Sequence, residues 1–313
     1  MSKVLAVFGA TGIQGNSIIN YVLNDPTLSK EYNIRAITRN VTSDAAKTLS
    51  EKVTVVQGDF TDPPSLSTAL SGAHTVFAMT MPVFTSDVQS NYDAEYNSGK
   101  IIADASVSQG AEYIIFSTLP SPRAISGGKY KGVHHFDSKA AIEEYIRSLP
   151  VKSAFISPGG FMTNFAQMPL FKPQKVGDEW VLSLPRTGKA TMPLIEAVED
   201  TGKFVGAILA EPEKYEGKRF CAAERLYSMD EIAAAMAEAT GKKVVYQDIG
   251  VEAFVEKLAG MPPAIGEVFQ YGDEFGGYYG PETAEVVQWA IENARGKLTS
   301  LKEYLEKSNF KLE

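Results

Sequence analysis

Three glycines spaced three residues apart interrupt the apolar start of the chain, in the segment VFGATGIQGNS. A glycine at the end of a strand lets the backbone turn sharply, and glycines within the turn let a diphosphate approach the backbone amides. The helix that follows would present unpaired N–H groups and a partial positive charge to the phosphates. An ordinary structural turn is the alternative. In the predicted nucleotide-binding turn, Gly9 makes the sharp turn, Gly12 lets the pyrophosphate approach the backbone, and Gly15 lets the helix pack closely on the strand.

Side chains after the next two expected strands bear on the identity of the nucleotide. Arg39 in ITRN stands where NAD-preferring proteins often carry an acid for the ribose 2′-hydroxyl. A guanidinium suits a 2′-phosphate, so we predict NADP as the cofactor and NAD as a weaker ligand, unless Arg39 is an ordinary surface residue. In QGDF, Asp59 could accept from the adenine amino group while Phe60 flanks the ring. A turn aspartate is the alternative for Asp59.

The segment HFDSK carries half of a reductase signature. Short-chain reductases use a Tyr-x-x-x-Lys pair on one helical face for proton transfer, and here His135 replaces the tyrosine while Lys139 is kept. Lys139 is predicted to anchor the nicotinamide ribose, and to be the catalytic acid–base group only if the chain is an enzyme. It could instead pair with Glu143, four residues on. His135 is either a weak replacement acid or a packing or surface residue.

Strand-like and helix-like segments alternate over the first half of the chain. Continuous apolar strands separated by helices are typical of a parallel sheet covered on both faces. We therefore predict an α/β fold with a doubly wound parallel sheet, a Rossmann domain, over residues 1–157. The expected strands are 3–9, 33–39, 53–59, 74–80, 111–117 and 151–157. The expected helices are 12–24, 43–50, 63–72, 88–109 and 135–149.

Residues 158–313 predict a second, smaller α/β domain of mixed structure that closes a cleft, with the chain around 218–224 returning to the main sheet. Ser228 and Glu231 form a capping-box pattern at the start of a helix over 228–241. The other expected elements are a hairpin arm at 179–185, a short strand at 244–250, a glycine- and tyrosine-rich loop at 271–281, and a closing helix at 300–310.

The composition argues against several classes of function. The chain has 313 residues and a net charge of −8, which disfavours a direct grip on nucleic acid phosphates. One cysteine and three histidines are too few for a disulfide or a convincing metal cluster. No apolar segment approaches the ~18 residues of a membrane span, and no cationic leader precedes the first strand. We expect a cytoplasmic protein without membrane, metal or direct nucleic acid contacts.

Several motifs together resemble one known family. VFGATGIQGNS, ITRN, VVQGDFTD, HFDSKAAIEEYI, PGGFMTNF and LSLP are similar to segments of the NmrA-like branch of the atypical short-chain dehydrogenases, above all its redox-sensor proteins. The resemblance implies a Rossmann domain, a smaller domain over the cleft, and bound NADP. It also implies cofactor contacts at Arg39, at Asp59 with Phe60, at Lys139, and in the glycine turn at Gly9, Ala10, Thr11, Gly12, Ile13 and Gln14. Further contacts implied by the resemblance are Thr80, Met81, Pro82, Phe161 and Asn164.

Two functions follow from this resemblance. The first is a redox sensor in which NADP(H) orders the loops 81–92 and 126–135 and so regulates a protein partner, for example in transcriptional regulation, which would place the protein in the nucleus as well. The alternative is an NADPH-dependent reductase, because relatives that lack the tyrosine use a lysine as the acid–base group. Its small apolar or aromatic substrate would lie against Met81, Phe84, Phe161 and Met162, which could equally be ordinary core residues. The sequence does not indicate an oligomeric state.

Overall fold

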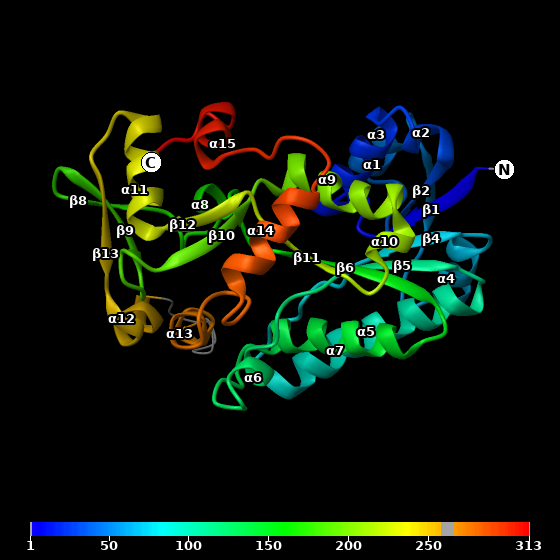
Figure 1. The fold of residues 1–313 in the computed structure, drawn as a ribbon, viewed down its shortest axis with the longest axis horizontal. Helices are drawn as coiled ribbons and strands as arrows, with labels where there is room; N and C mark the ends of the chain where they lie inside the picture. Colours follow the sequence, from blue (N-terminus) through cyan, green and yellow to red (C-terminus); the bar gives the residue numbers. More distant parts are fainter. Residues whose placement is uncertain (1, 258–265, 313) are drawn as a thin grey trace.

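The computed structural model describes residues 2–257 and 266–312 and confirms the predicted α/β class (Figure 1). Its main feature is a seven-stranded parallel sheet with the order β11-β6-β5-β4-β1-β2-β3. The first strands run from the middle of the sheet to one edge and the later strands to the other. The strands are β1 (Lys3–Val7), β2 (Tyr32–Thr38), β3 (Thr54–Gln57), β4 (Thr75–Ala78), β5 (Tyr113–Ser117), β6 (Lys152–Pro158) and β11 (Arg219–Ala222).

Helices cover both faces of this sheet because its central strands are apolar on both sides. In β1, Leu5 and Val7 pack on one face, while Ala6 packs in a separate cluster on the other. The first face holds α1 (Ile13–Asn24), α2 (Leu28–Glu31), α3 (Asp44–Ser50), α9 (Ala197–Ala210) and α10 (Pro212–Tyr215). The second holds α4 (Pro63–Leu70), α5 (Val88–Ser108) and α7 (His134–Ser148), and α6 (Pro122–Ile125) precedes α7. Figure 1 shows α5 and α7 side by side below the sheet.

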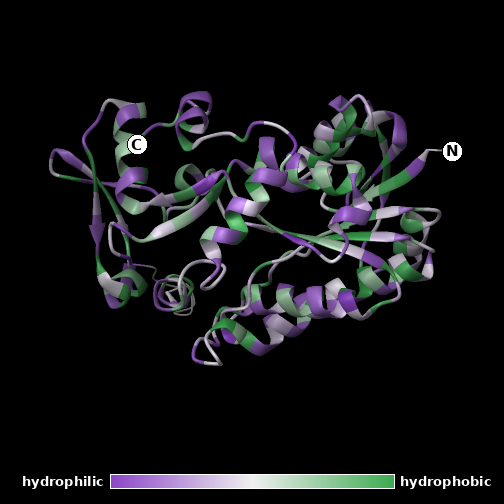
Figure 2. Cartoon of the chain, viewed as in Figure 1, coloured by the Kyte–Doolittle hydropathy of each residue, from purple (hydrophilic) through white to green (hydrophobic). Residues whose placement is uncertain are grey.

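The rest of the chain builds a smaller assembly of two three-stranded sheets with a core of its own. One sheet has the order β12-β10-β7 and the other β13-β9-β8. Figure 2 shows hydrophobic and hydrophilic residues interspersed along the helices, as expected of helices buried on one side only. The strands are β7 (Gly160–Phe161), β8 (Gln174–Val176), β9 (Glu179–Leu184), β10 (Thr191–Ile195), β12 (Arg225–Ser228) and β13 (Val244–Asp248). The helices are α8 (Asn164–Gln167), α11 (Met229–Thr240), α12 (Gly250–Lys257), α13 (Glu267–Glu274) and α15 (Leu301–Lys307), whereas α14 (Thr283–Asn293) packs against the edge strand β11 of the main sheet.

Local sequence signals explain several of these elements. The capping box is confirmed: Ser228 accepts from the Glu231 amide, and the Glu231 side chain accepts from the Ser228 amide at 2.7 Å. The predicted hairpin arm pairs with β8 in antiparallel register. No helix within residues 2–257 and 266–312 has both the length and the hydropathy needed to cross a bilayer.

Two expectations about the elements need correction, and one long helix was not predicted. The predicted glycine- and tyrosine-rich loop begins inside α13, because buried Tyr271 packs its helix into the core. The predicted loop 126–135 ends at Val133, since α7 starts at His134. Helix α9, which the sequence analysis did not predict, contains Gly202 and Gly206.

The two glycines of α9 allow this helix to pack closely against α1. A Cβ atom at Gly202 would lie 2.6 Å from the Ser17 carbonyl oxygen and collide with the Tyr21 Cβ, and one at Gly206 would collide with the Tyr21 ring. Glycine has a low intrinsic propensity for the helix interior. The close contact between α1 and α9 therefore outweighs this propensity at Gly202 and Gly206. The contact fixes α1 on the sheet, and with it the glycine turn that precedes α1.

We expect Gly202→Ala to destabilise the protein by about 1–3 kcal/mol, because its new methyl group meets backbone that cannot move away. Exposed Val198 on the same helix provides the control, and Val198→Ala should change stability by less than about 0.5 kcal/mol. Urea unfolding of both variants measures the difference. A Gly202→Ala protein as stable as the wild type would contradict the packing argument.

Candidate functional site

The glycine turn lies where the strand order of the main sheet reverses. From β1 the chain proceeds outward through β2 and β3, whereas β4 lies on the other side of β1 and leads to β5 and β6. Ligands of open α/β sheets bind outside the carboxyl ends of the strands at such a point. The turn beginning at Gly9 follows β1 there, and Met79 and Thr80 follow β4. This edge of the sheet is therefore the candidate site.

The turn is shaped to receive an anion. Gly9 has a φ of 63°, and the Gly12 amide donates to the Gly9 carbonyl at 2.8 Å. A Cβ at Gly15 would collide with the Gly9 carbonyl oxygen and lie 2.7 Å from the Ala10 Cα. No side chain caps the N-terminus of α1, and its first turn, which starts at Ile13, has no acidic residue. The amides of this turn thus fit a diphosphate.

Arg39 and Asp59 lie beyond the ends of β2 and β3. Arg39 is exposed. Asp59 Oδ1 accepts from the Thr61 amide at 2.9 Å and the Thr61 hydroxyl at 2.8 Å. These hydrogen bonds, together with the charge of Arg39, lower the pKa of Asp59. Asp59 therefore shapes a turn through one oxygen, and its contact with adenine stays a prediction, as does that of half-buried Phe60, which packs against the second-face core.

Lys139 is buried in a network that joins three elements. Its ammonium group donates to the Thr80 carbonyl at 2.9 Å and the Thr80 hydroxyl at 2.8 Å, and it forms an ion pair with Glu95 on α5. The Glu95 carboxylate also accepts from the Thr80 hydroxyl at 2.8 Å and the Ser138 hydroxyl at 2.6 Å. An ammonium group has three protons, so these contacts engage all of them.

The alternative partner that the sequence suggested for Lys139 is wrong. Glu143 instead accepts from Arg147 at 2.7 Å and from Arg219 at 3.4 Å, because its carboxylate faces β11. Burial lowers the pKa of Lys139, and the Glu95 carboxylate partly counteracts this effect. Lys139 therefore fixes the end of β4 to α5 and α7.

His135 belongs to an aromatic cluster at the start of α7. Its ring lies 5.4 Å from that of Phe84 and 4.8 Å from that of Phe136. Burial, and then the charges of His134 and Lys139, lower the pKa of His135 to about 3. The imidazole is neutral at physiological pH, so it has no imidazolium proton to donate.

The segment after β4 exposes apolar side chains beside this cluster. Met81, Val83 and Phe84 are 69%, 41% and 54% exposed. The segment is held in place nonetheless: His134 Nε2 contacts the Val83 carbonyl at 3.1 Å, and Asn91 binds the Thr85 backbone at 3.1 and 2.9 Å. The structure therefore already orders much of this segment, and the predicted loop 81–92 ends at Asp87 because α5 starts at Val88. An apolar surface adjoins the predicted nicotinamide end.

The remaining predicted contacts come from several segments at this edge. Half-buried Pro82 belongs to the segment after β4. Phe161 lies in β7, directly after β6 reaches the edge, and Asn164 starts α8. Between them the Thr163 hydroxyl is buried and has no hydrogen-bond partner within the described residues. Met162 is fully buried in the core of the smaller assembly, so the pocket-lining role suggested for it is wrong.

Sequence reasoning missed Glu95, Asn91 and Ser117. Ser117 at the end of β5 donates to Gln14 Oε1 at 2.9 Å and thereby connects this strand end to the first turn of α1. Asn91 and Glu95 share the buried face of α5 with Gly99, at intervals of four residues. The sequence did contain a signal for Glu95: it is an acidic residue on the helix face that points to the core, where a charge needs a partner.

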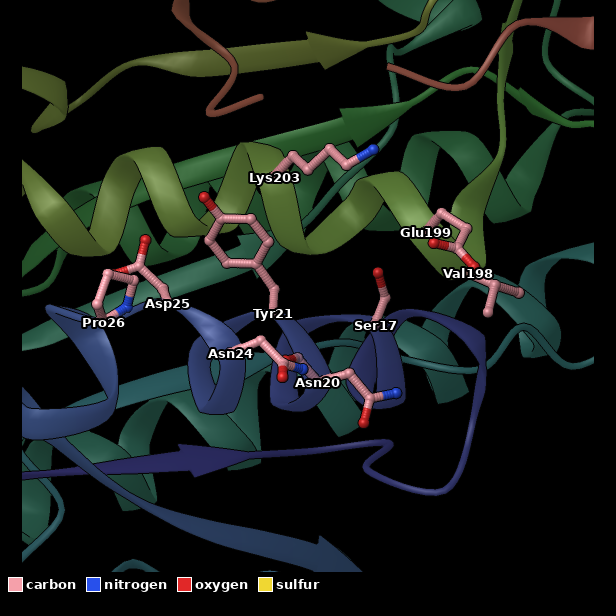
Figure 3. Close-up of a pocket in the computed structure, with 9 residues that line it drawn as sticks. All are labelled: Ser17, Asn20, Tyr21, Asn24, Asp25, Pro26, Val198, Glu199 and Lys203. Carbon is pink, nitrogen blue, oxygen red and sulfur yellow. The ribbon is translucent and has the colours of Figure 1, made fainter. Parts of the chain in front are cut away.

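A polar hollow of about 490 Å³ lies elsewhere, between α1 and α9 (Figure 3). Two of its charged groups already have partners: Lys203 pairs with Asp200 at 2.6 Å, and Asp25 pairs with Arg295 at 2.9 Å. We therefore assign this hollow to the packing of the two helices. Within the described part of the chain, no three histidine, cysteine or acidic side chains gather in a way that could hold a metal.

Comparisons with known proteins give a consistent result. The model of the NmrA-like family matches residues 1–305. An NmrA-like family domain-containing protein of Dictyostelium discoideum is 27% identical over the whole of both chains. The NmrA-like family domain-containing oxidoreductase lnaB of Aspergillus flavus is 29% identical, over 91% of this chain and 88% of its own.

Two solved structures have the same fold. NmrA, a negative transcriptional regulator in complex with NADP, has a TM-score of 0.78 and 23% identity, over 98% of this chain and 95% of its own. A second structure of that regulator contains NAD. The triphenylmethane reductase of Citrobacter sp., complexed with NADP(H), has a TM-score of 0.72 and 22% identity over 99% and 100% of the two chains. At these identities the likeness concerns the fold alone.

The pKa of His135 is open to direct measurement. We expect its ring signals in NMR spectra to stay at their neutral positions from pH 8 to pH 5, because the folded protein holds the pKa at about 3, below the ordinary value of 6.5. His135→Gln identifies the signals. A midpoint near pH 6.5 would contradict the desolvation of this ring and would restore His135 as a proton donor.

Proposed function

Because the chain belongs to the NmrA-like family, we propose that it binds NADP(H) and acts as a sensor of that cofactor for a protein partner. One observation favours a sensor over an enzyme: Thr80 and Glu95 engage all three protons of the Lys139 ammonium group. Lys139, the residue best placed to act as an acid, thus uses its protons in hydrogen bonds that stabilise the site. His135, at a pKa of about 3, offers no replacement.

The cofactor would lie across the carboxyl ends of the strands. The uncapped first turn of α1 would hold the diphosphate, and exposed Arg39 the 2′-phosphate. Asp59 and Phe60 would flank the adenine, while Thr80 to Pro82, Lys139, Phe161 and Asn164 would surround the nicotinamide half. NAD, without the 2′-phosphate, would bind more weakly. The NADP and NAD complexes of NmrA, which has this fold, support both ligands.

Bound NADPH would supply a hydride to an acceptor, but a sensor needs only the difference between occupied and empty sites. A segment well placed to report it precedes α7. Lys129 and the Tyr130 hydroxyl bind Glu274 at 2.6 and 2.8 Å, and the Gly132 amide donates to Glu267 at 2.8 Å. This segment therefore bridges from α7 to α13 of the smaller assembly.

To anchor the nicotinamide ribose, Lys139 would exchange one of its Thr80 contacts for a ribose oxygen, and this rearrangement would act on α7 and, through it, on the bridge. A partner that binds one state of the bridge more tightly than the other would couple cofactor occupancy to regulation. A transcription factor as partner would place the protein in the cytoplasm and the nucleus.

A reductase is the second candidate, and the exposed side chains of Met81, Val83 and Phe84 favour it. They would receive a small apolar or aromatic substrate beside the nicotinamide. The oxidoreductase name of the lnaB relative is consistent with such chemistry. In this case Lys139 would have to exchange a contact with Thr80 for one with the substrate and donate that proton.

Arg39→Ala tests the cofactor preference. The substitution should weaken the binding of NADPH by about tenfold or more and the binding of NADH by less than about threefold. Only NADPH carries the 2′-phosphate that would pair with the guanidinium. Isothermal titration calorimetry measures both affinities. The control is Lys175→Ala on exposed β8, which also removes one positive charge. Equal losses for NADPH and NADH would show that Arg39 does not bind the 2′-phosphate.

The sensor and the reductase predict different behaviour with NADPH. For the sensor, a panel of carbonyl, imine and benzylic ether compounds should leave the nicotinamide absorbance unchanged. NADPH should also slow tryptic cleavage at Lys129 and Lys131, because the bridge to α13 becomes more ordered, while cleavage at Lys175 continues as before. Substrate-dependent oxidation that disappears in Lys139→Met would contradict the sensor and establish the reductase.

A further inference from the structure

The predicted nicotinamide end of the site contains one buried ion pair of zero net charge. The side chains of Lys139 and Glu95 are 11% and 0% exposed. Lys139 also binds Thr80, so the pair lies directly beyond the carboxyl end of β4. It comes from α5 and α7, which pack against each other beneath the sheet (Figure 1).

The two forms of the cofactor differ in charge at one end. The nicotinamide ring of NADP+ carries a positive charge that the ring of NADPH lacks. A fixed charge nearby therefore favours one form over the other, and burial protects such an interaction from screening by salt. A balanced pair keeps this effect small, because each partner offsets the other.

We propose that the Lys139–Glu95 pair sets the preference of this chain between oxidised and reduced NADP(H). The inference rests on the proposed function, because it requires the nicotinamide to lie near Thr80 and Lys139. Glu95 is then a positioning residue: it is fully buried and acts through Lys139 and through its charge. The hydroxyls of Thr80 and Ser138 donate to its carboxylate independently of Lys139. The site thus keeps a structural support when either charge is removed.

Charge-removing variants of the full-length protein test the proposal. The quantity is the ratio of the Kd for NADP+ to the Kd for NADPH, from calorimetry at about pH 7. Glu95→Gln removes the carboxylate and leaves the ammonium group as an unbalanced positive charge. Because this charge repels the oxidised ring, the ratio should rise at least about tenfold. Lys139→Met leaves the carboxylate with its two hydroxyl donors and should lower the ratio by a similar factor. The double variant should return to within about threefold of the wild type, since neither charge remains.

A second buried pair provides the control for folding and buried charge. Asp200 and Lys203 on α9 are 0% and 19% exposed, and Asp200→Asn should leave the ratio unchanged. Unchanged ratios in both single variants, or shifts in the same direction, would overturn the proposal. If Glu95→Gln does not fold, the Lys139→Met ratio decides. A wild-type protein that binds neither form would instead overturn the proposed function itself.

Discussion

The candidate site depends on the need to pair a buried charge. An ammonium group excluded from water is costly unless an opposite charge and hydrogen bonds surround it, and removing either partner leaves an uncompensated charge. Glu95 and Thr80 meet that need for Lys139, and Ser138 in turn donates to the Glu95 carboxylate, so that α5, the end of β4 and α7 are joined. One electrostatic requirement thus determines how two helices and a strand meet where the strand order reverses.

The glycine turn depends on packing instead of charge. Its helix, α1, is fixed by close contact with α9, where two glycines leave room for Tyr21 and for the backbone at Ser17. The first turn of α1 then keeps its amides free, because no side chain caps it. The two halves of the site are therefore positioned by different means, small residues at the diphosphate end and a buried ion pair at the nicotinamide end.

The same features bear on the choice between a regulator and an enzyme. A lysine with three engaged protons is a good support and a poor acid, whereas the apolar surface formed by Met81, Val83 and Phe84 suits a substrate as well as a protein partner. Relatives of this chain include proteins named as oxidoreductases, and a regulator shares its fold.

The sequence by itself determined the elements that depend on local patterns: the parallel sheet from its apolar strands, the turn at Gly9 from its glycines, and the α11 cap from Ser228 and Glu231. Only the tertiary structure decided the partner of Lys139. Glu95 is 44 residues away in the chain, and Glu143 is closer along the helix but turns toward Arg219. Helical spacing shows which side chains share a face, whereas a buried charge takes its partner from whichever element packs against that face.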